Sequence, residues 1–207
     1  YPILNDLSPA ATFIARNYNA DADVMAFMEE ATSIMREAYK ECAWMFETNS
    51  DEEIAGRRLV DCKGNINYTV WSDVLICPHC GEEIVFYDAA ADPKTGKVSD
   101  NFICTKCQAK LKKGDCEKAF TPVFDAALNK TIDIIKQKPV LINYQYGNKQ
   151  YNKKPDAYDL EVLGRIDSLT IPYWFPTDRL CEGRESRRND KIGLTHVHHF
   201  FYKRTLF

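Results

Sequence analysis

Apolar residues in the first quarter of the chain recur at steps of three and four residues, which is the spacing of one face of a helix. Asp21 or Asp23 is placed to begin this helix. A shorter helix is expected before it, with Ser8 as N-cap, Pro9 as its first residue and residues 10–18 as its continuation. The apolar stripe predicts a face that packs in a core. Its members are Val24, Phe27, Met28, Ala31, Ile34, Met35, Ala38, Tyr39, Cys42, Met45 and Phe46.

Segments rich in strand-forming residues dominate the rest of the chain. They predict strands over residues 66–76, 120–125, 131–136, 140–144 and 149–152, with a hairpin turn at Gly147-Asn148. A helix is the alternative for residues 131–136, because the apolar residues there fit neither period cleanly. Further helices are expected from Pro155-Asp156 to about Leu169 and over residues 202–207.

Three stretches lack a clear period. Residues 48–64 are polar and charged and predict a loop or a short surface helix, while residues 179–191 mix both charges and predict a mobile loop. Residues 171–176 are aromatic and carry two prolines, which exclude a central strand. These rings are expected to pack on a sheet, with a stacking surface as the alternative.

Two Cys-x-x-Cys pairs carry the strongest chemical signal: Cys77 with Cys80, and Cys104 with Cys107. This is the ligand pattern of a structural zinc site, because two intervening residues let a tight turn direct both sulfurs to one metal. Gly81 suits the positive φ of such a turn. The segment between the pairs predicts a hairpin with strands over 82–87 and 97–103 and turn residues at 92–96.

Other interpretations of the cysteines explain less. A disulfide framework fits small secreted chains, and a thioredoxin-like redox pair would explain one Cys-x-x-Cys but not two. The four remaining cysteines have no partner at metal spacing: Cys42, Cys62, Cys116 and Cys181. We therefore expect one closed, four-thiolate zinc site that contributes folding energy rather than chemistry.

Composition narrows the functional classes. The chain has 207 residues, 45% hydrophobic content and a net charge of −3, which fits one large domain or two small ones and gives no global attraction to nucleic acid. No apolar run approaches the length of a bilayer span, so no membrane partner is expected. Eight cysteines with a metal pattern favour a reducing, cytoplasmic location. Because the first residue is Tyr1, we expect a piece of a longer protein.

Nucleic-acid contact would depend on local basic stretches. Phosphate contact is one interpretation of each stretch, and a solvated surface is the other. The two densest stretches are Lys110, Lys112 and Lys113 after the second cysteine pair, and Arg184, Arg187 and Arg188 in the charged loop.

Two further groups of polar residues admit a functional interpretation. Asp6 follows a short apolar segment that is expected to end a strand, and it precedes a helix. In doubly wound folds, an acidic residue at this position binds a ribose diol. The alternative is that Asp6 only caps the turn. His196 and His198 alternate on a predicted strand and would face the same way. A second metal site there is disfavoured, because catalytic zinc needs three protein ligands and no carboxylate or cysteine lies nearby in sequence.

Several segments occur together in a recognisable order: residues 5–11, the two cysteine pairs, and residues 139–144, 171–178 and 193–200. As a set they resemble the central part of a prokaryotic DNA amino-methyltransferase, a family that modifies adenine N6 or cytosine N4. The resemblance implies methyl transfer from S-adenosylmethionine to a base that is flipped out of the duplex. It also implies that Asp6 binds the cofactor ribose.

The same resemblance places the family's Gly-rich cofactor loop before Tyr1 and its Asp-Pro-Pro-aromatic catalytic motif after Phe207. This chain alone is then expected neither to methylate DNA nor to bind S-adenosylmethionine tightly, and to act with the remainder of the methyltransferase chain. The zinc-containing region would be an insertion used in DNA recognition. The alternative is a stand-alone zinc-ribbon module that binds nucleic acid or protein without enzymatic activity.

The sequence thus predicts an α+β fold in three parts. Residues 1–64 would be a helical remnant of a Rossmann-like methyltransferase fold, and residues 65–117 a zinc ribbon. Residues 118–207 would form a small antiparallel β region with one helix and a basic, His-containing end.

Overall fold

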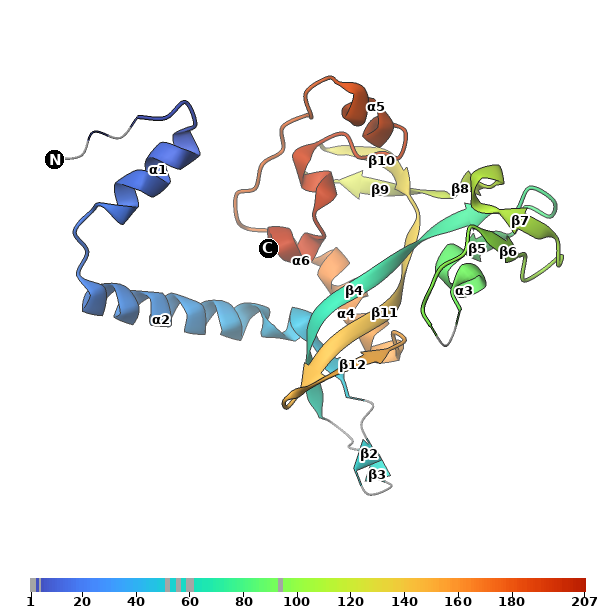
Figure 1. Cartoon of the computed structure of the whole chain (residues 1–207), viewed down its shortest axis with the longest axis horizontal. Helices are drawn as coiled ribbons and strands as arrows, with labels where there is room; N and C mark the ends of the chain where they lie inside the picture. Colours follow the sequence, from blue (N-terminus) through green and yellow to red (C-terminus); the bar gives the residue numbers. More distant parts are fainter. Residues whose placement is uncertain (1–2, 4, 51–52, 55–56, 59–61, 93–94) are drawn as a thin grey trace. The chain divides into compact units, whose positions relative to one another are not determined.

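The computed structural model describes residues 3, 5–50, 53–54, 57–58, 62–92 and 95–207. It divides into two compact units, Tyr1–Ala43 and Trp44–Phe207 (Figure 1). The fold is mixed α and β, as predicted, and its sheets are antiparallel. In the described residues, no helix combines the length and the apolar content needed to cross a membrane.

The first unit contains two helices, α1 (Pro9–Tyr18) and α2 (Val24–Cys42), which begin where the capping residues predict. The Ser8 side chain accepts a hydrogen bond from the Ala11 N–H at 3.4 Å. Asp23, rather than Asp21, caps α2, since its carboxylate accepts from the N–H groups of Met25 and Ala26 at 3.0 and 3.1 Å. Each cap satisfies backbone donors that have no partner within the helix.

The prediction that the apolar stripe packs in a core is wrong for the part of the stripe that lies on α2. No described residue of α1 or α2 is buried, and Phe27 and Met35 are 64% and 69% exposed. The prediction is confirmed for Met45, beyond the end of α2, which is 1% exposed and packs with Val162 and Ile166. The strand expected before α1 is not observed either: Ile3 is unpaired and exposed, and Leu4 lies outside the described residues. A Rossmann-like fragment is therefore not confirmed.

The second unit is built on an antiparallel sheet in the order β1 (Glu47–Asn49), β4 (Lys63–Ile76), β11 (Gln137–Tyr146) and β12 (Lys149–Lys153). The long strands β4 and β11 curl together along their length (Figure 1). Their register shifts between Pro139 and Leu141 and between Asn143 and Tyr144. Such irregularities bend and twist a strand pair, which accounts for the curl.

Most predicted strands and helices are confirmed with small changes of boundary. The helix alternative for residues 131–136 is wrong, because β10 pairs with β9 along its whole length. The segment 48–64 was expected to lack strands, but it contains β2 and β3, the end of β1 and the start of β4. The remaining elements are β2 (Glu53–Ile54), β3 (Arg57–Arg58), β9 (Phe120–Asp125), β10 (Lys130–Ile135), α4 (Ala157–Ser168), α5 (Arg184–Asp190), η3 (Val197–Phe200) and α6 (Lys203–Leu206).

The cysteine-rich region (residues 74–118) packs around its own core. It contains the end of β4, β5 (Glu83–Val85), α3 (Phe86–Ala90), β6 (Asn101–Ile103), β7 (Lys110–Lys112), η2 (Lys113–Asp115) and β8 (Glu117–Lys118). Its buried residues are Leu75, Cys77, Ile84, Phe86, Ala90, Phe102, Cys104 and Leu111. The expected boundary between residues 64 and 65 falls within β4, which belongs both to the curled sheet and to this region.

The hairpin predicted between the cysteine pairs has different partners in the structure. β5 pairs with β4, and β6 pairs with β7, while a single bridge between Ala91 and Val98 remains of the expected pairing. The strand expected over residues 82–87 gives way to α3 at Phe86. A helix at this point buries Phe86 and Ala90, four residues apart, on one face against the core.

The aromatic segment 171–176 is extended and forms no strand, as its prolines require. Phe175 packs against η3 rather than on a sheet, and its ring centroid lies 5.8 Å from that of His198. The expected packing fails for Trp174, which is 86% exposed.

Gly193 occupies a position that a larger residue cannot share. Its φ is +84°, and an added Cβ would lie 2.2 Å from the carbonyl oxygen of Asp133 in β10. Gly147 also has a positive φ, +59°, but open space around it. We expect Gly147→Ala to cost about 1 kcal/mol of folding free energy from backbone strain and Gly193→Ala about 2 kcal/mol more from the clash. Urea unfolding of both variants measures the difference, and equal midpoints would contradict it.

Candidate metal centre

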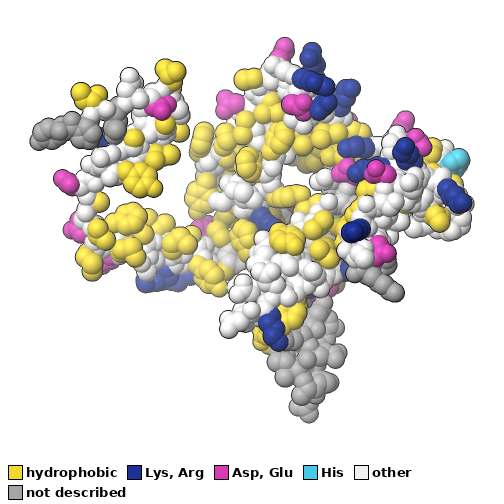
Figure 2. All heavy atoms as spheres, viewed as in Figure 1, with side chains coloured by type: hydrophobic (Ala, Val, Ile, Leu, Met, Phe, Trp, Pro, Cys, Tyr) yellow, Lys and Arg dark blue, Asp and Glu magenta, His cyan; other side chains and the backbone are white. Residues whose placement is uncertain are grey.

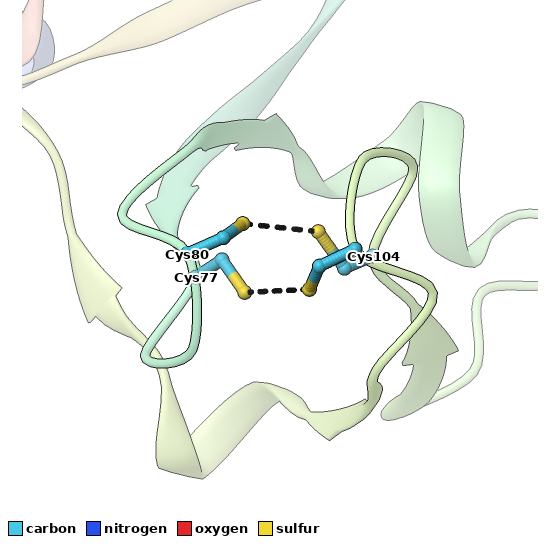
Figure 3. Close-up of side chains that lie close together, drawn as sticks. Cys77, Cys80 and Cys104 are labelled. Carbon is cyan, nitrogen blue, oxygen red and sulfur yellow. Dashed lines mark hydrogen bonds between the residues drawn. The ribbon is translucent and has the colours of Figure 1, made fainter.

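The two cysteine pairs lie in loops that close in the same way. After β4, the Gly81 N–H donates to the Cys77 carbonyl at 2.9 Å, and Gly81 has φ +70°. Between β6 and β7, the Gln108 N–H donates to the Cys104 carbonyl at 3.0 Å, with φ +61° at Gln108. Each loop therefore turns its two sulfurs to one side, and Figure 3 shows the labelled sulfurs of Cys77, Cys80 and Cys104 converging from the facing loops.

The four sulfurs form one compact group. The Sγ atoms of Cys77 and Cys107 are 3.7 Å apart, and those of Cys80 and Cys104 are 3.8 Å apart. These distances are too long for a disulfide, whose sulfurs lie about 2.05 Å apart. All four sulfurs lie within 4.8 Å of one another, so the cluster could hold a metal ion. In the described part of the chain, no other cysteine joins such a group.

The thiols of this group differ in pKa because each receives different hydrogen bonds from the backbone and from the neighbouring thiols. Backbone hydrogen bonds from Cys107 and Lys106 lower the pKa of Cys104 to about 6. A backbone hydrogen bond from Glu82 lowers the pKa of Cys80, but burial and the other three thiols raise it, with a net value of about 12. Metal binding requires thiolates, so a metal ion entering this group must displace protons.

The predicted basic residues after the second cysteine pair divide between two environments. Lys110 and Lys112 flank the buried Leu111 on β7, so both project from the exposed face of the strand. The Lys113 ammonium instead lies over the Phe86 ring, 4.3 Å from its centroid. Lys106 forms an ion pair with Glu82.

The charged segment expected to be a mobile loop contains a helix, α5 (Arg184–Asp190), which corrects that prediction. Arg184, Arg187 and Arg188 are exposed and stand three and four residues apart, so they share one face of the helix. Arg188 pairs with Glu185 at 3.1 Å. Figure 2 shows Lys and Arg side chains gathered over α5.

Asp6 lies in the turn before α1. Its Oδ1 accepts a hydrogen bond from the Ser8 N–H at 2.8 Å, which is the turn-capping role that local sequence favours. The ribose-binding role stays a prediction.

The histidines near the end of the chain do not alternate on a strand, because residues 197–200 form the 3₁₀-helix η3. His198 and His199 instead meet Asp125, at the end of β9. Sequence reasoning missed Asp125, because it considered only carboxylates near the histidines and Asp125 is 73 residues from His198. The one signal in the sequence was that Asp125 ends a predicted strand over residues 120–125.

Comparison with known proteins gives no relative from which to assign the chain. No protein-family model matches it, and neither the curated proteins nor the solved structures include a significant match.

Proposed function

We propose that Cys77, Cys80, Cys104 and Cys107 hold one structural zinc ion. A tetrahedral ion with Zn–S bonds of about 2.3 Å places its sulfurs about 3.8 Å apart. The two separations of 3.7 and 3.8 Å match this value. Four thiolates fill the coordination sphere, so the ion would staple the two loops and leave no open position for substrate.

We propose further that the chain belongs to an S-adenosylmethionine-dependent DNA amino-methyltransferase and that its second unit, Trp44–Phe207, contacts DNA. The resemblance of the sequence segments supports the parent enzyme. Two exposed basic surfaces support DNA contact: Lys110 with Lys112 on β7, and Arg184 with Arg187 on α5. In the described residues, none of these four side chains has an acidic partner within ion-pair distance. They are thus available to phosphates.

DNA contact predicts a specific salt dependence. Each of the four unpaired cations that reaches a phosphate should add about −0.9 to the slope of log affinity against log salt concentration on duplex DNA. Binding of the 207-residue chain to duplex DNA is measured by fluorescence anisotropy across a salt series. We expect Lys110→Glu with Lys112→Glu to weaken binding and to reduce the slope by about 2. Arg184→Glu with Arg187→Glu should have the same effect.

The control is Lys138→Glu with Lys149→Glu, which changes the net charge equally at two other exposed positions. An effect as large as that of the basic-surface variants would indicate general charge repulsion. Identical slopes in all proteins would mean that neither surface touches DNA.

A further inference from the structure

The strands β6 and β7 form a two-stranded antiparallel ribbon (Figure 1), and within the described part of the chain neither strand pairs with a third. Phe102 and Leu111 lie opposite each other and are 5% and 6% exposed, so one face of the ribbon packs in the core of the cysteine-rich region. Side chains alternate along a strand, so the other face is open. It carries the two remaining cross-strand pairs, Asn101 with Lys112 and Ile103 with Lys110.

The open face of the ribbon combines two cations, an amide and an aliphatic side chain. All four residues are exposed, and Ile103 is 50% exposed. Among the described residues, the Asn101 amide and the ammonium groups of Lys110 and Lys112 have no hydrogen-bond or ion-pair partner. Neither strand carries an acidic residue. The charge of this face therefore complements a polyanion, and its amide and aliphatic groups remain free to contact what the polyanion displays.

The dimensions of the ribbon fit one groove of a nucleic-acid duplex. The major groove of B-DNA, about 12 Å wide, admits a two-stranded β-ribbon, whereas its minor groove is only about 6 Å wide. Side chains cannot read the narrow major groove of an RNA duplex. Asn101 and Ile103 stand two residues apart on β6, which is about 7 Å along a strand. Two base-pair steps of B-DNA rise by a comparable distance, about 3.4 Å each.

We propose that the β6–β7 ribbon enters the major groove of duplex DNA, where Asn101 and Ile103 contact bases and Lys110 and Lys112 contact phosphates. This inference rests on the proposed DNA contact and specifies its mode. An Asn amide can form hydrogen bonds with both N6 and N7 of adenine, and an apolar side chain can contact the C5-methyl group of thymine. The ribbon should therefore prefer A·T pairs, and Asn101 and Ile103 determine that preference.

The cysteine cluster has a direct place in this arrangement. The loop that connects β6 to β7 carries Cys104 and Cys107, and Cys104 follows directly on Ile103. The Cys104 N–H donates to the Ala109 carbonyl at 2.9 Å, so the strands stay paired up to the loop. A metal ion on the four sulfurs would fix this loop and hold the base-contacting side chains in one register, as recognition by a rigid element requires.

Modified duplexes test the inference with the wild-type chain. Binding of the 207-residue chain to a duplex of alternating A·T pairs is compared with binding to two analogues. One replaces thymine by uracil, which removes the C5-methyl group, and the other replaces adenine by 7-deazaadenine, which removes N7. Both changes lie in the major groove and leave the phosphates intact. We expect the affinity to fall about fourfold for each methyl group contacted and about fivefold without N7.

Two variants assign these preferences to the ribbon. Ile103→Ala should bind the thymine and uracil duplexes equally, and Asn101→Ala should bind the adenine and 7-deazaadenine duplexes equally. Each should keep the wild-type salt slope, because both lysines remain. The matched control is Val123→Ala, which shortens an apolar side chain, 39% exposed, on β9 and should keep both preferences.

The outcomes separate this inference from the proposed function. Failure of the wild-type chain to bind any duplex would overturn both. Equal affinities for the natural and modified duplexes, with a salt slope that Lys110→Glu with Lys112→Glu still reduces, would leave phosphate contact intact and overturn base contact by the ribbon. Preferences that persist in Ile103→Ala and Asn101→Ala would overturn it as well, because another surface would then lie in the groove.

Discussion

Replacing Cys104 by Ser is expected to abolish metal binding by the cysteine-rich region and to unfold it. Cys104 is fully buried at the centre of that region's core. Its loss removes one thiolate and leaves three facing each other without a complete coordination sphere. Structural zinc sites contribute on the order of 10 kcal/mol to the folding of small modules, so the loss of the metal should strongly destabilise this region. Hydrogen exchange of β6 and β7 amides, together with metal analysis, measures both effects.

Cys181→Ser is the matched control, because Cys181 is exposed and lies outside the sulfur group. It should keep one equivalent of metal in the four-thiolate site and wild-type exchange rates. Slow exchange in Cys104→Ser, equal to that of the control, would show that the region folds without its metal ion.

Lys153→Met is expected to destabilise the second unit by about 3–5 kcal/mol, because it leaves a buried charge without its partner. The Lys153 ammonium is 2% exposed and lies 2.7 Å from Asp156 and 3.0 Å from Asp159, whose side chain is also 2% exposed. It donates as well to the Asn49 carbonyl at 3.0 Å. The ammonium thus joins β1, β12 and α4, and chemical denaturation of the variant measures its loss.

The neighbouring Lys154 provides the control. Its side chain is 82% exposed and 3.6 Å from Asp88, so Lys154→Met should change stability by less than about 1 kcal/mol. A similar small loss in Lys153→Met would mean that the buried network relaxes or takes in water.

The Lys153 network also predicts a change in acid stability. Burial raises the pKa of Asp156, but hydrogen bonds from Lys153 and the Asp159 backbone outweigh it and hold the pKa below 3.8. Asp156 therefore contributes stability above its ordinary pKa and loses it as the pH falls through the lower folded value. As the pH falls, the free energy of unfolding should therefore decrease less steeply in Lys153→Met than in the wild type.

Local signals predicted the parts of this fold that depend on local physics. Capping by Ser8, Asp23 and Asp156 set the starts of three helices. The cysteine spacing predicted which four sulfurs meet, because each loop closes within a few residues of its own pair.

Long-range pairing could not be predicted in the same way. Nothing in residues 82–103 indicates that β5 pairs with β4 rather than with β6, since that choice depends on the packing of α3. The mixed charges of α5 concealed a helix whose first-turn Glu185 pairs with Arg188. Asp125 and the histidines come together from segments 73 and 74 residues apart, and Gly193, before the histidines, passes close to the backbone of β10.

The central claim is that four cysteines hold zinc, and X-ray absorption at the zinc edge tests it most directly. The wild-type chain is loaded with one equivalent of Zn²⁺. We predict a single shell of four sulfurs at about 2.3 Å. A shell dominated by nitrogen or oxygen, or failure to retain the ion with the cysteines paired as disulfides, would contradict the account.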